Sequence, residues 1–320
     1  MKAHYIWIGP PKADHQDVRG PIEMRNNFGP EVEIHFWCLD AQVDAFAHKL
    51  RDVNKITHGI IVHGIESALR TATGTAHRWW YWYTRKEDWA VAEMLNIVTV
   101  SAGLGTTRDL VNAKNGFAYF LLYTWGGYVM DTNVMPLGVR AKLPDYDHFM
   151  SPVIGTDDTN MVTHDPIVGD WFPRWRDHQG GGRCQASISS SLVRSYRSSS
   201  AVRKIREQGN HEGLIPLPEC WMLYSPQYNG TAWRALEAFI CAWRDLVEIR
   251  KGPSREEYHF SCANAVIDSL IHAIAHDDRG QCVNVNRTHF WTGDKTDSRV
   301  DVRALGLTKL YNNTHKFRAA

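Results

Sequence analysis

The first 40 residues contain two strand-like segments separated by enough chain for a helix, and this arrangement restricts the fold most strongly. Residues 4–8 (HYIWI) are largely β-branched or aromatic and run into a Gly-Pro-Pro sequence, which predicts a buried strand followed by a sharp loop. Residues 31–39 (EVEIHFWCL) alternate charged and apolar side chains, which predicts a second strand. A crossover helix between two strands makes a β-α-β unit, so we expect a parallel sheet covered by helices.

Chain length favours a single domain, and cysteine content favours reduced thiols. With 320 residues and 43% hydrophobic content, the chain can bury a large core, and we expect a single domain over residues 1–320. Its six cysteines include no CxxC pair, so we interpret them as reduced thiols rather than as a zinc site or a disulfide scaffold.

Charge and hydropathy exclude two classes of partner. Lys plus Arg number 36 and Asp plus Glu number 35, so a net charge of +1 provides no field that would attract nucleic acid. No apolar run approaches the roughly 20 residues of a membrane span, and the first residues have no signal-peptide core. We therefore expect a soluble protein with no transmembrane segment and no nucleic-acid partner.

Further along the chain, helical and strand-like patterns alternate. Residues 41–53 and 88–94 have helical spacing, residues 97–100 (IVTV) predict a third short strand, and residues 107–123 predict a helix that ends at a Gly-Gly pair. Residues 128–130 then resume as a strand. The carboxyl ends of strands in α/β sheets are where ligands bind, so the three residues after this strand are of special interest.

The second half of the chain has fewer local signals. Residues 157–200 are rich in Gly and Ser, which is compatible with a mobile lid or with a simple surface loop. Residues 233–250 and 258–276 are the clearest helices of this half. The tail from residue 307 (LTKLYNNTHKF) has enough apolar content to dock on the domain.

An acid-x-amide triplet follows the strand at residues 128–130. Asp131 and Asn133 are separated by one residue, so strand periodicity would place both oxygen ligands on one face. Hard divalent cations prefer such oxygen ligands and can neutralise a departing nucleotide diphosphate. By itself the triplet is a weak signal, because Asp and Asn are common in turns.

The residues around this triplet resemble a known family. Residues 114–138 (KNGFAYFLLYTWGGYVMDTNVMPLG) resemble the DxD segment of GT-A glycosyltransferases that include the large clostridial glucosylating toxins, bacterial arginine N-acetylglucosaminyltransferase effectors and fungal Golgi mannosyltransferases. The opening HYIWIGP is similar to the IWIG strand of the same family. The two blocks occur in the family's order and cover about 40 residues.

The resemblance implies a fold and a domain organisation. It implies an α/β GT-A-like glycosyltransferase fold, with a Rossmann-like mixed sheet flanked by helices and a largely helical C-terminal part. Residues 1–140 would form the nucleotide-sugar-binding half. Residues 141–320 would form the acceptor-side half, with a C-terminal tail that returns to the site.

The resemblance also implies roles for individual residues. Asp131 and Asn133 would be the catalytic pair, and Trp7 would stack on the uracil of a UDP-sugar. Mn²⁺ or Mg²⁺ would be held by Asp131, Asn133, Asn312 and Thr314, with Phe317 nearby. The implied nucleotide-sugar-binding residues are Ile6, Trp7, Ile8, Asn115, Gly126, Gly127, Tyr128, Asp131 and Thr132.

Four positions depart from the family's pattern. Asn133 replaces the second carboxylate, Asn115 replaces a helix aspartate, and Ala118 replaces an arginine that would hold the donor phosphate. Val129 replaces the strand tyrosine, while Tyr128 is displaced by one residue onto the opposite face. These changes leave open a degenerate GT-A-like protein that binds nucleotide or a partner without transfer.

The predicted activity is metal-dependent, retaining transfer of a hexose or N-acetylhexosamine from a UDP-sugar to a protein or small-molecule acceptor. The similarity to toxins suggests a bacterial protein that acts in the cytoplasm or is delivered into a target cell. Walker A, GxGxxG and GxSxG sequences are missing, which disfavours kinase, dehydrogenase and serine-hydrolase functions.

The aromatic run and Glu219 each have two possible interpretations, and two histidines are interpreted as structural. The aromatic run at residues 78–89 (RWWYWYTRKEDW) could be a core element or a sugar-stacking surface. His58 and His63 are five residues apart, which does not match a helical metal motif, so we interpret them as structural histidines. Glu219 could be a donor-site acid or an ordinary strand-edge residue.

Overall fold

The computed structural model describes most of the first half of the chain and several segments of the second half. The described residues are 1–53, 59–76, 84–138, 141–154, 198–199, 203, 217–218, 220–250, 266, 269–276, 281–288, 298–302 and 305–311. Most of the aromatic run, the Gly- and Ser-rich segment up to residue 197, Glu219 and residues 312–320 lie outside them. In the described ranges, no helix is both long enough and apolar enough to cross a membrane.

The predicted β-α-β opening is confirmed. Strands β1 (Lys2–Ile6) and β2 (Glu33–Cys38) pair in parallel, and helix α1 (Arg19–Phe28) connects them. Helix α2 (Val43–Val53) then leads to β3 (Ile60–Gly64), which pairs in parallel with β2. Two short 3-10 turns flank these elements, η1 (Gly29–Glu31) and η2 (Asp40–Gln42).

Three helices precede the next strand. They are α3 (Ile65–Ala76), α4 (Thr84–Leu104) and α5 (Thr107–Thr124). Strand β4 (Gly127–Met130) follows α5 and pairs in parallel with β1, as the sequence predicts. The Thr106 side chain caps α5 by accepting the Asp109 N–H at 3.3 Å.

The prediction of a strand at residues 97–100 is wrong, because this segment lies inside α4. The β-branched residues do favour a strand locally. However, Ile97 and Val98 are fully buried in the core while Val100 is exposed, and α4 contacts both α3 and α5. Burial of one helical face among neighbouring helices therefore outweighs the local preference.

The second half of the chain extends the sheet and adds one long helix. Helix α9 (Gly230–Arg250) confirms the helix expected at residues 233–250. Of the helix expected at residues 258–276, the structure describes only residues 266 and 269–276, and residues 269–275 are helical. The sequence analysis did not predict the strands that follow β4, of which the first lies in the first half of the chain. They are β5 (Val134–Pro136), β6 (Met150–Ile154), β7 (Leu217–Pro218), β8 (Met222–Ser225), β9 (Gln281–Thr288), β10 (Ser298–Val302) and β11 (Leu307–Tyr311).

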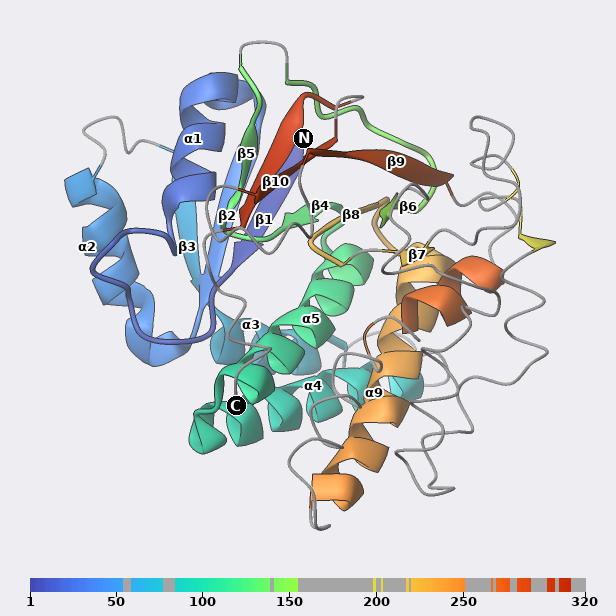
Figure 1. Ribbon diagram of the computed structural model, residues 1–320. Helices are drawn as coiled ribbons and strands as arrows, with labels where there is room; N and C mark the ends of the chain where they lie inside the picture. Colours follow the sequence, from blue (N-terminus) through green and yellow to red (C-terminus); the bar gives the residue numbers. More distant parts are fainter. Residues whose placement is uncertain are drawn as a thin grey trace.

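The described strands form one mixed sheet. Their order is β3-β2-β1-β4-β8-β6-β9-β10-β11-β5, with β7 paired to β6. The pairs among β3, β2, β1 and β4 are parallel, whereas β8 is antiparallel to β4 and β5 is antiparallel to β11. The mixed sheet flanked by helices agrees with the predicted α/β, GT-A-like fold class (Figure 1). The largely helical C-terminal part expected with it is not observed in the described residues, where strands β6 to β11 follow residue 141 because long-range pairing extends the sheet.

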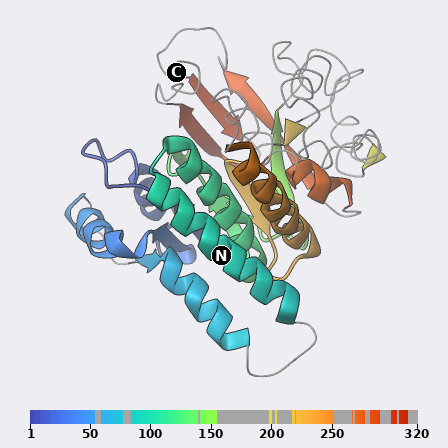
Figure 2. The ribbon, with the colours of Figure 1, turned by 90° about the horizontal axis from the view of Figure 1, so that it is seen from below.

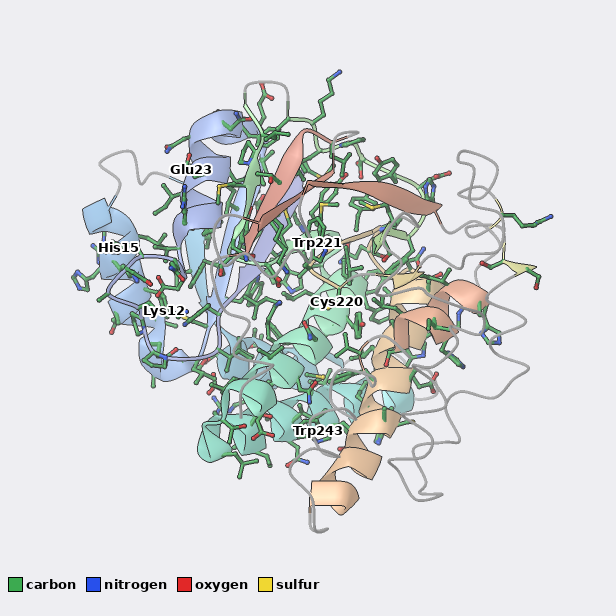
Figure 3. The ribbon with its side chains drawn as sticks, viewed as in Figure 1. Lys12, His15, Glu23, Cys220, Trp221 and Trp243 are labelled. Carbon is green, nitrogen blue, oxygen red and sulfur yellow. The ribbon has the colours of Figure 1, made fainter. Side chains whose placement is uncertain are left out.

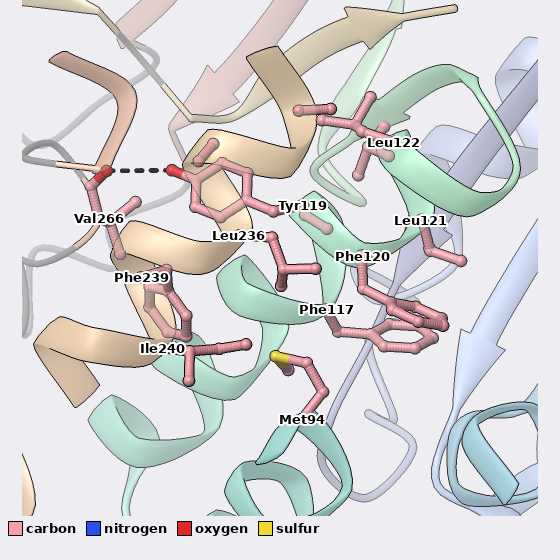
Figure 4. Close-up of a cluster of buried hydrophobic side chains, with 14 of the residues drawn as sticks. Met94, Phe117, Tyr119, Phe120, Leu121, Leu122, Leu236, Phe239, Ile240 and Val266 are labelled. Carbon is pink, nitrogen blue, oxygen red and sulfur yellow. Dashed lines mark hydrogen bonds between the residues drawn. The ribbon is translucent and has the colours of Figure 1, made fainter. Parts of the chain in front are cut away.

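Two apolar clusters cover the two faces of the sheet. On one face, α3, α4, α5 and α9 lie side by side as a layer (Figure 2) and enclose a cluster that includes Phe117, Leu121 and Phe239 (Figure 4). The Tyr119 hydroxyl in this layer donates to the Val266 carbonyl at 3.0 Å. On the other face, α1 and α2 pack on a second cluster that includes Tyr5.

The Gly-Gly pair ends α5 and redirects the chain into β4, as expected. Gly126 and Gly127 have φ angles of 64° and 90°, which favour glycine over other residues. A Cβ atom on Gly127 would lie 2.6 Å from the Lys2 carbonyl oxygen. These two residues therefore set the start of the strand that leads to Asp131.

Candidate functional site

Asp131, Thr132 and Asn133, here called the DTN turn, connect β4 to β5 at the carboxyl end of β4. The Val134 N–H donates to the Asp131 carbonyl at 2.9 Å, which closes a β-turn. The Asp131 N–H donates to the Trp221 carbonyl at 2.8 Å, just before β8. Backbone hydrogen bonds thus fix the position from which the Asp131 side chain projects.

Helix α1 approaches the DTN turn at its first residues. The Gly20 N–H donates to the Thr132 carbonyl at 2.7 Å. A Cβ atom at Gly20 would lie 2.5 Å from that oxygen and 2.6 Å from the Val134 carbonyl oxygen. The helix therefore contacts the turn this closely because residue 20 has no side chain.

The carboxylate of Asp131 binds two lysines. The Lys114 ammonium on α5 pairs with Oδ1, and the Lys309 ammonium on β11 pairs with Oδ2 at 2.6 Å. The exposed fractions of the three side chains are 19% for Asp131, 17% for Lys114 and 11% for Lys309. The ammonium of Lys309 also lies 5.6 Å from the Trp221 ring centroid, and Figure 3 shows Trp221 in the middle of the molecule.

Strand geometry explains why these two lysines meet Asp131. In the β5–β11 pair, Lys309 is the register partner of Val134. Val134 is only three positions beyond Asp131. Lys114 lies on α5, the helix that covers the Val129 face of β4. Side chains alternate along a strand, so Asp131 leaves β4 on the same face as Val129 and points toward α5.

The two lysines keep the Asp131 carboxylate charged. Burial raises the pKa of Asp131, but the two neighbouring ammonium groups outweigh burial and lower the pKa to about 2. At neutral pH the three side chains carry two positive charges and one negative charge. Lys114, Asp131 and Lys309, here called the charged triad, therefore have a net charge of +1.

The described donor atoms do not fit a divalent cation at Asp131. Both carboxylate oxygens are already paired with ammonium groups, which would repel a metal ion. Among the described residues, no group of three or more His, Cys, Asp or Glu side chains could hold a metal. Asn133 is half-buried and offers a neutral amide, while Asn312 and Thr314 lie outside the described residues.

Trp7 lies just beyond β1, on the strand next to β4. Its N–H donates to the Trp37 carbonyl at 2.9 Å, and its indole N–H donates to the Pro10 carbonyl at 3.1 Å. The Lys12 ammonium lies 4.9 Å from the Trp7 ring centroid, and Figure 3 shows Lys12 in the loop that leads to α1. Trp7 and the DTN turn therefore lie at the same edge of the sheet.

The side chains of Trp7 and Asp131 start from opposite faces of that sheet. Tyr5 and Met130 are register partners and both belong to the second apolar cluster. Alternation then places Trp7 on the Tyr5 face and Asp131 on the other face. Trp7 does pack against the second cluster, whereas Asp131 pairs with α5 in the first layer. A ligand that contacted both residues would have to pass around the strand ends.

The other residues implied by the resemblance occupy different environments. Ile6 and Ile8 are core residues with exposed fractions of 1% and 7%. Asn115 is 5% exposed on α5, and its Oδ1 has no hydrogen-bond partner among the described residues. Ala118 and Val129, which replace the family's arginine and tyrosine, are each 2% exposed in the first cluster.

Gly126, Gly127 and Tyr128 are at the far end of β4 from Asp131. Tyr128 belongs to the second cluster and donates its hydroxyl to the Pro144 carbonyl at 2.7 Å. Its position on the opposite face from Val129 agrees with the sequence analysis. The structure therefore brings Thr132 and Asn133 to Asp131 and keeps the Gly-Gly pair away from it.

Sequence reasoning missed Lys114, Lys309, Gly20 and Trp221. A usable signal existed for Lys114, because it interrupts a helical apolar stripe with Leu110, Phe117 and Leu121 and a charge there needs a partner. Lys309 gave no comparable signal, because its contact with Asp131 depends on the long-range pairing of β11 with β5.

A cluster of histidine and tryptophan rings lies on strands β1, β2 and β3, on the face of the sheet that carries Val129. The rings of His4 and His35 stack with centroids 4.9 Å apart, and His35 Nδ1 lies 2.8 Å from His63 Nε2. The Trp37 indole N–H donates to His4 Nδ1 at 3.2 Å. Burial, with neighbouring positive groups, lowers the pKa of His4 to about 3 and that of His63 to about 4. His63 is half-buried in this cluster, which agrees with its interpretation as a structural histidine, whereas His58 lies outside the described residues.

An open cavity of about 550 Å³ lies at the amino ends of β1 and β4. Its lining includes Lys2, Trp125, Gly126 and Asp145. The Lys2 ammonium lies 5.2 Å from the Trp125 ring centroid. Because parallel β1 and β4 place Asp131 at their other end, this cavity is separate from the charged triad.

No family model and no curated protein sequence matches the chain. Solved structures that are similar to it include the PaToxG glycosyltransferase, at 8% identity and a TM-score of 0.42, over 86% of this chain and 66% of that one. The ligand-free glycosyltransferase domain of the YGT toxin is similar at 11% identity and a TM-score of 0.38, over 86% of this chain and 74% of that one.

A third similar structure is the catalytic domain of alpha-toxin from Clostridium novyi. Its identity is 11% and its TM-score 0.28, over 82% of this chain and 62% of that one. The chain thus spans 62% to 74% of the length of these three solved chains. Two of these three structures are glycosyltransferases by name and the third is the catalytic domain of a toxin, and identities and TM-scores this low transfer no residue role to this chain.

Proposed function

We propose that the chain is a glycosyltransferase that moves a hexose or N-acetylhexosamine from a UDP-sugar to an acceptor with retention of configuration. The observation that carries this proposal is the net positive triad of Lys114, Asp131 and Lys309 beside the DTN turn, at the carboxyl edge of an α/β sheet. Ligands commonly bind at such edges, and the leaving group in this chemistry is an anionic diphosphate.

The chemical step needs stabilisation of charge rather than a protein nucleophile. The bond between the anomeric carbon and the diphosphate oxygen breaks, and its electron pair stays on that oxygen. The acceptor oxygen or nitrogen attacks the anomeric carbon from the same face, and its proton passes to the diphosphate oxygen. Ammonium groups held near the departing diphosphate would lower the energy of this charge separation.

A divalent cation is the expectation from the family resemblance, and it would supply further neutralisation of the diphosphate. The described residues around Asp131 do not fit such an ion, because ammonium groups already pair with both carboxylate oxygens. The proposed mechanism therefore contains no step through a metal. The mechanism depends on the lysines, on the fixed DTN turn, and on Trp7 as a stacking surface for the base.

The acceptor and the place of action are also part of the proposal. The resemblance to toxins favours a protein side chain as acceptor and delivery into a target cell. A small-molecule acceptor in a bacterial cytoplasm is compatible with the same chemistry, because the donor half of the reaction is identical.

A nucleotide-binding protein without transfer activity is the second candidate. Ala118 and Val129 favour it, since both are buried in the apolar core where the resembled family has an arginine and a tyrosine. The donor phosphate and sugar would then have fewer polar contacts. This candidate predicts nucleotide binding without release of sugar.

Hydrolysis of UDP-sugars by the purified chain distinguishes the two candidates. We expect release of UDP from at least one UDP-hexose or UDP-N-acetylhexosamine, and a loss of about tenfold or more in turnover for Asp131→Ala. Lys2→Met removes an ammonium at the far end of β1 and serves as the matched control, with turnover within about twofold of the parent. Binding without turnover, unaffected by Asp131→Ala, would favour the second candidate.

A further inference from the structure

We propose that Lys114 and Lys309 are the diphosphate-binding groups of this chain, and that Asp131 positions their ammonium groups instead of ligating a metal. This inference rests on the proposed function, because it assigns the anion site for the nucleotide donor. It replaces the metal centre implied by the resemblance with a cation pair contributed by the chain itself.

The geometry of the triad is that of one carboxylate holding two separate cations. Lys114 pairs with Oδ1 and Lys309 pairs with Oδ2, so the two ammonium groups lie on either side of a single side chain. One comes from α5 and the other from β11, two elements that are far apart in the sequence. An ammonium has three N–H donors, so each lysine can also donate to a phosphate oxygen while it contacts Asp131.

The surroundings hold the lysines in place. The DTN turn is fixed by hydrogen bonds from Gly20 and to Trp221, and the ring of Trp221 lies 5.6 Å from the Lys309 ammonium. The exposed fractions of 17% for Lys114 and 11% for Lys309 show that both side chains are largely packed and still accessible. Little side-chain entropy therefore remains to be lost when an anion binds.

Charge makes a diphosphate a better ligand here than a metal ion. The triad has a net charge of +1, so it attracts an anion and repels a divalent cation. Asp131 reduces the repulsion between the two ammonium groups and allows them to stay close together without a ligand. A diphosphate, with several oxygens, can take additional hydrogen bonds from both lysines.

Calorimetric titration of pyrophosphate into the intact chain, in EDTA and in Mn²⁺, tests the inference without requiring any variant. We expect binding in EDTA, with an affinity that Mn²⁺ changes by less than about threefold. Lys114→Met and Lys309→Met should each weaken binding about tenfold or more, because a charge-assisted hydrogen bond is lost. Lys2→Met is the matched control and should change affinity by less than about twofold.

Asp131→Asn gives opposite results for a cation pair and for a metal site. With a cation pair, pyrophosphate still binds in EDTA with an affinity within about tenfold of the parent's, because both lysines remain and the loss of a competing anion offsets the loss of their positioning partner. With a metal site, the substitution removes the main ligand and abolishes Mn²⁺-dependent binding. Binding that requires Mn²⁺, or that disappears in Asp131→Asn, would overturn the inference.

A parallel titration with UDP separates this inference from the proposed function. Pyrophosphate binding in EDTA without any UDP binding would support the anion site and reject the nucleotide-sugar donor. UDP binding only in the presence of Mn²⁺ would support the nucleotide donor and reject the cation pair. Binding of both ligands in EDTA supports both.

Discussion

The Lys309 ammonium lies 2.6 Å from Oδ2 of Asp131, although 178 residues separate the two in the sequence. This ion pair links β11 to the turn that leaves β4, and thus joins the second half of the chain to the first. It also occupies a carboxylate oxygen that a metal ion would need. The contact therefore bears on both the stability of the domain and the chemistry of the site.

A double-mutant cycle on Lys309 and Asp131 should give substantial coupling in the free energy of unfolding. We expect Lys309→Met alone to destabilise the protein by about 2 kcal/mol, because it leaves a largely buried carboxylate with one partner fewer. Lys309→Met and Asp131→Asn together should show a coupling of about 1 kcal/mol or more. Urea denaturation of the four proteins measures these values.

The matched control for this cycle is the exposed ion pair between Arg70 and Asp40, in which the Arg70 side chain is 62% exposed. Arg70→Met should change stability by about 0.5 kcal/mol or less. Coupling near zero for the Lys309–Asp131 pair would contradict the role assigned to the triad.

Gly20→Ala should destabilise the protein and disturb the DTN turn. The new Cβ atom would lie 2.5 Å from the Thr132 carbonyl oxygen, so α1 or the turn has to shift. We expect a loss of about 1–3 kcal/mol in the free energy of unfolding, measured by urea denaturation. In Gly103→Ala, within α4, the Cβ atom meets nothing within 4 Å, and we expect no loss or a gain of about 0.5–1 kcal/mol. Equal effects of the two substitutions would argue against the close approach of α1.

Stability should fall as the pH drops from 7 to 5, because His4 and His63 both have lowered pKa values in the folded protein. Neutral His4 accepts the Trp37 indole N–H at Nδ1 and contacts the Gly126 carbonyl through Nε2, so protonation at Nδ1 would oppose the Trp37 donor. Its pKa in the folded protein is about 3, below the ordinary value of 6.5. The unfolded chain therefore binds more protons below pH 6.5, and stability present above that pH is lost as the pH falls.

The expected loss from His4 is about 2 kcal/mol between pH 6.5 and pH 5. Urea denaturation at several pH values measures it, and His4→Gln should reduce the slope of the profile by the His4 share, while the His63 share remains. His15 is exposed and has a positive φ of 56°, so His15→Asn, which keeps the backbone conformation, is the control for loss of a histidine outside the buried cluster. A profile in which His4→Gln has the parent's slope would contradict the role of His4.

Trp7→Ala should weaken the binding of UDP more than that of pyrophosphate. Stacking of a base on an aromatic ring contributes about 1–3 kcal/mol, so the affinity for UDP should fall about fivefold or more. Pyrophosphate has no base, and its affinity should change by less than about twofold. Titration of both ligands into both proteins is the measurement. Parallel losses for the two ligands would place Trp7 in a structural role only.

Local sequence patterns were sufficient for the elements that surround the DTN turn. The β-α-β opening, the helix of residues 107–124 and the Gly-Gly turn into β4 all have short-range causes, such as alternation, helical spacing and positive φ. The same local reasoning failed at residues 97–100, where packing against other helices decides the structure.

The charged triad could not be predicted, because its parts meet through long-range pairing. Lys309 reaches Asp131 only because β11 pairs with β5, and β5 is too short to give a pattern of its own. Likewise, the side chains of Trp7 and Asp131 lie on opposite faces of the sheet because of the register between β1 and β4. The sequence of either strand alone does not determine that register.

A crystal structure of the chain with UDP, grown in EDTA, tests the central claim most directly. The account predicts diphosphate oxygens within hydrogen-bond distance, about 3 Å, of the Lys114 and Lys309 ammonium groups, with the base toward Trp7. A diphosphate bound elsewhere, for example in the cavity beside Lys2 and Trp125, would contradict it.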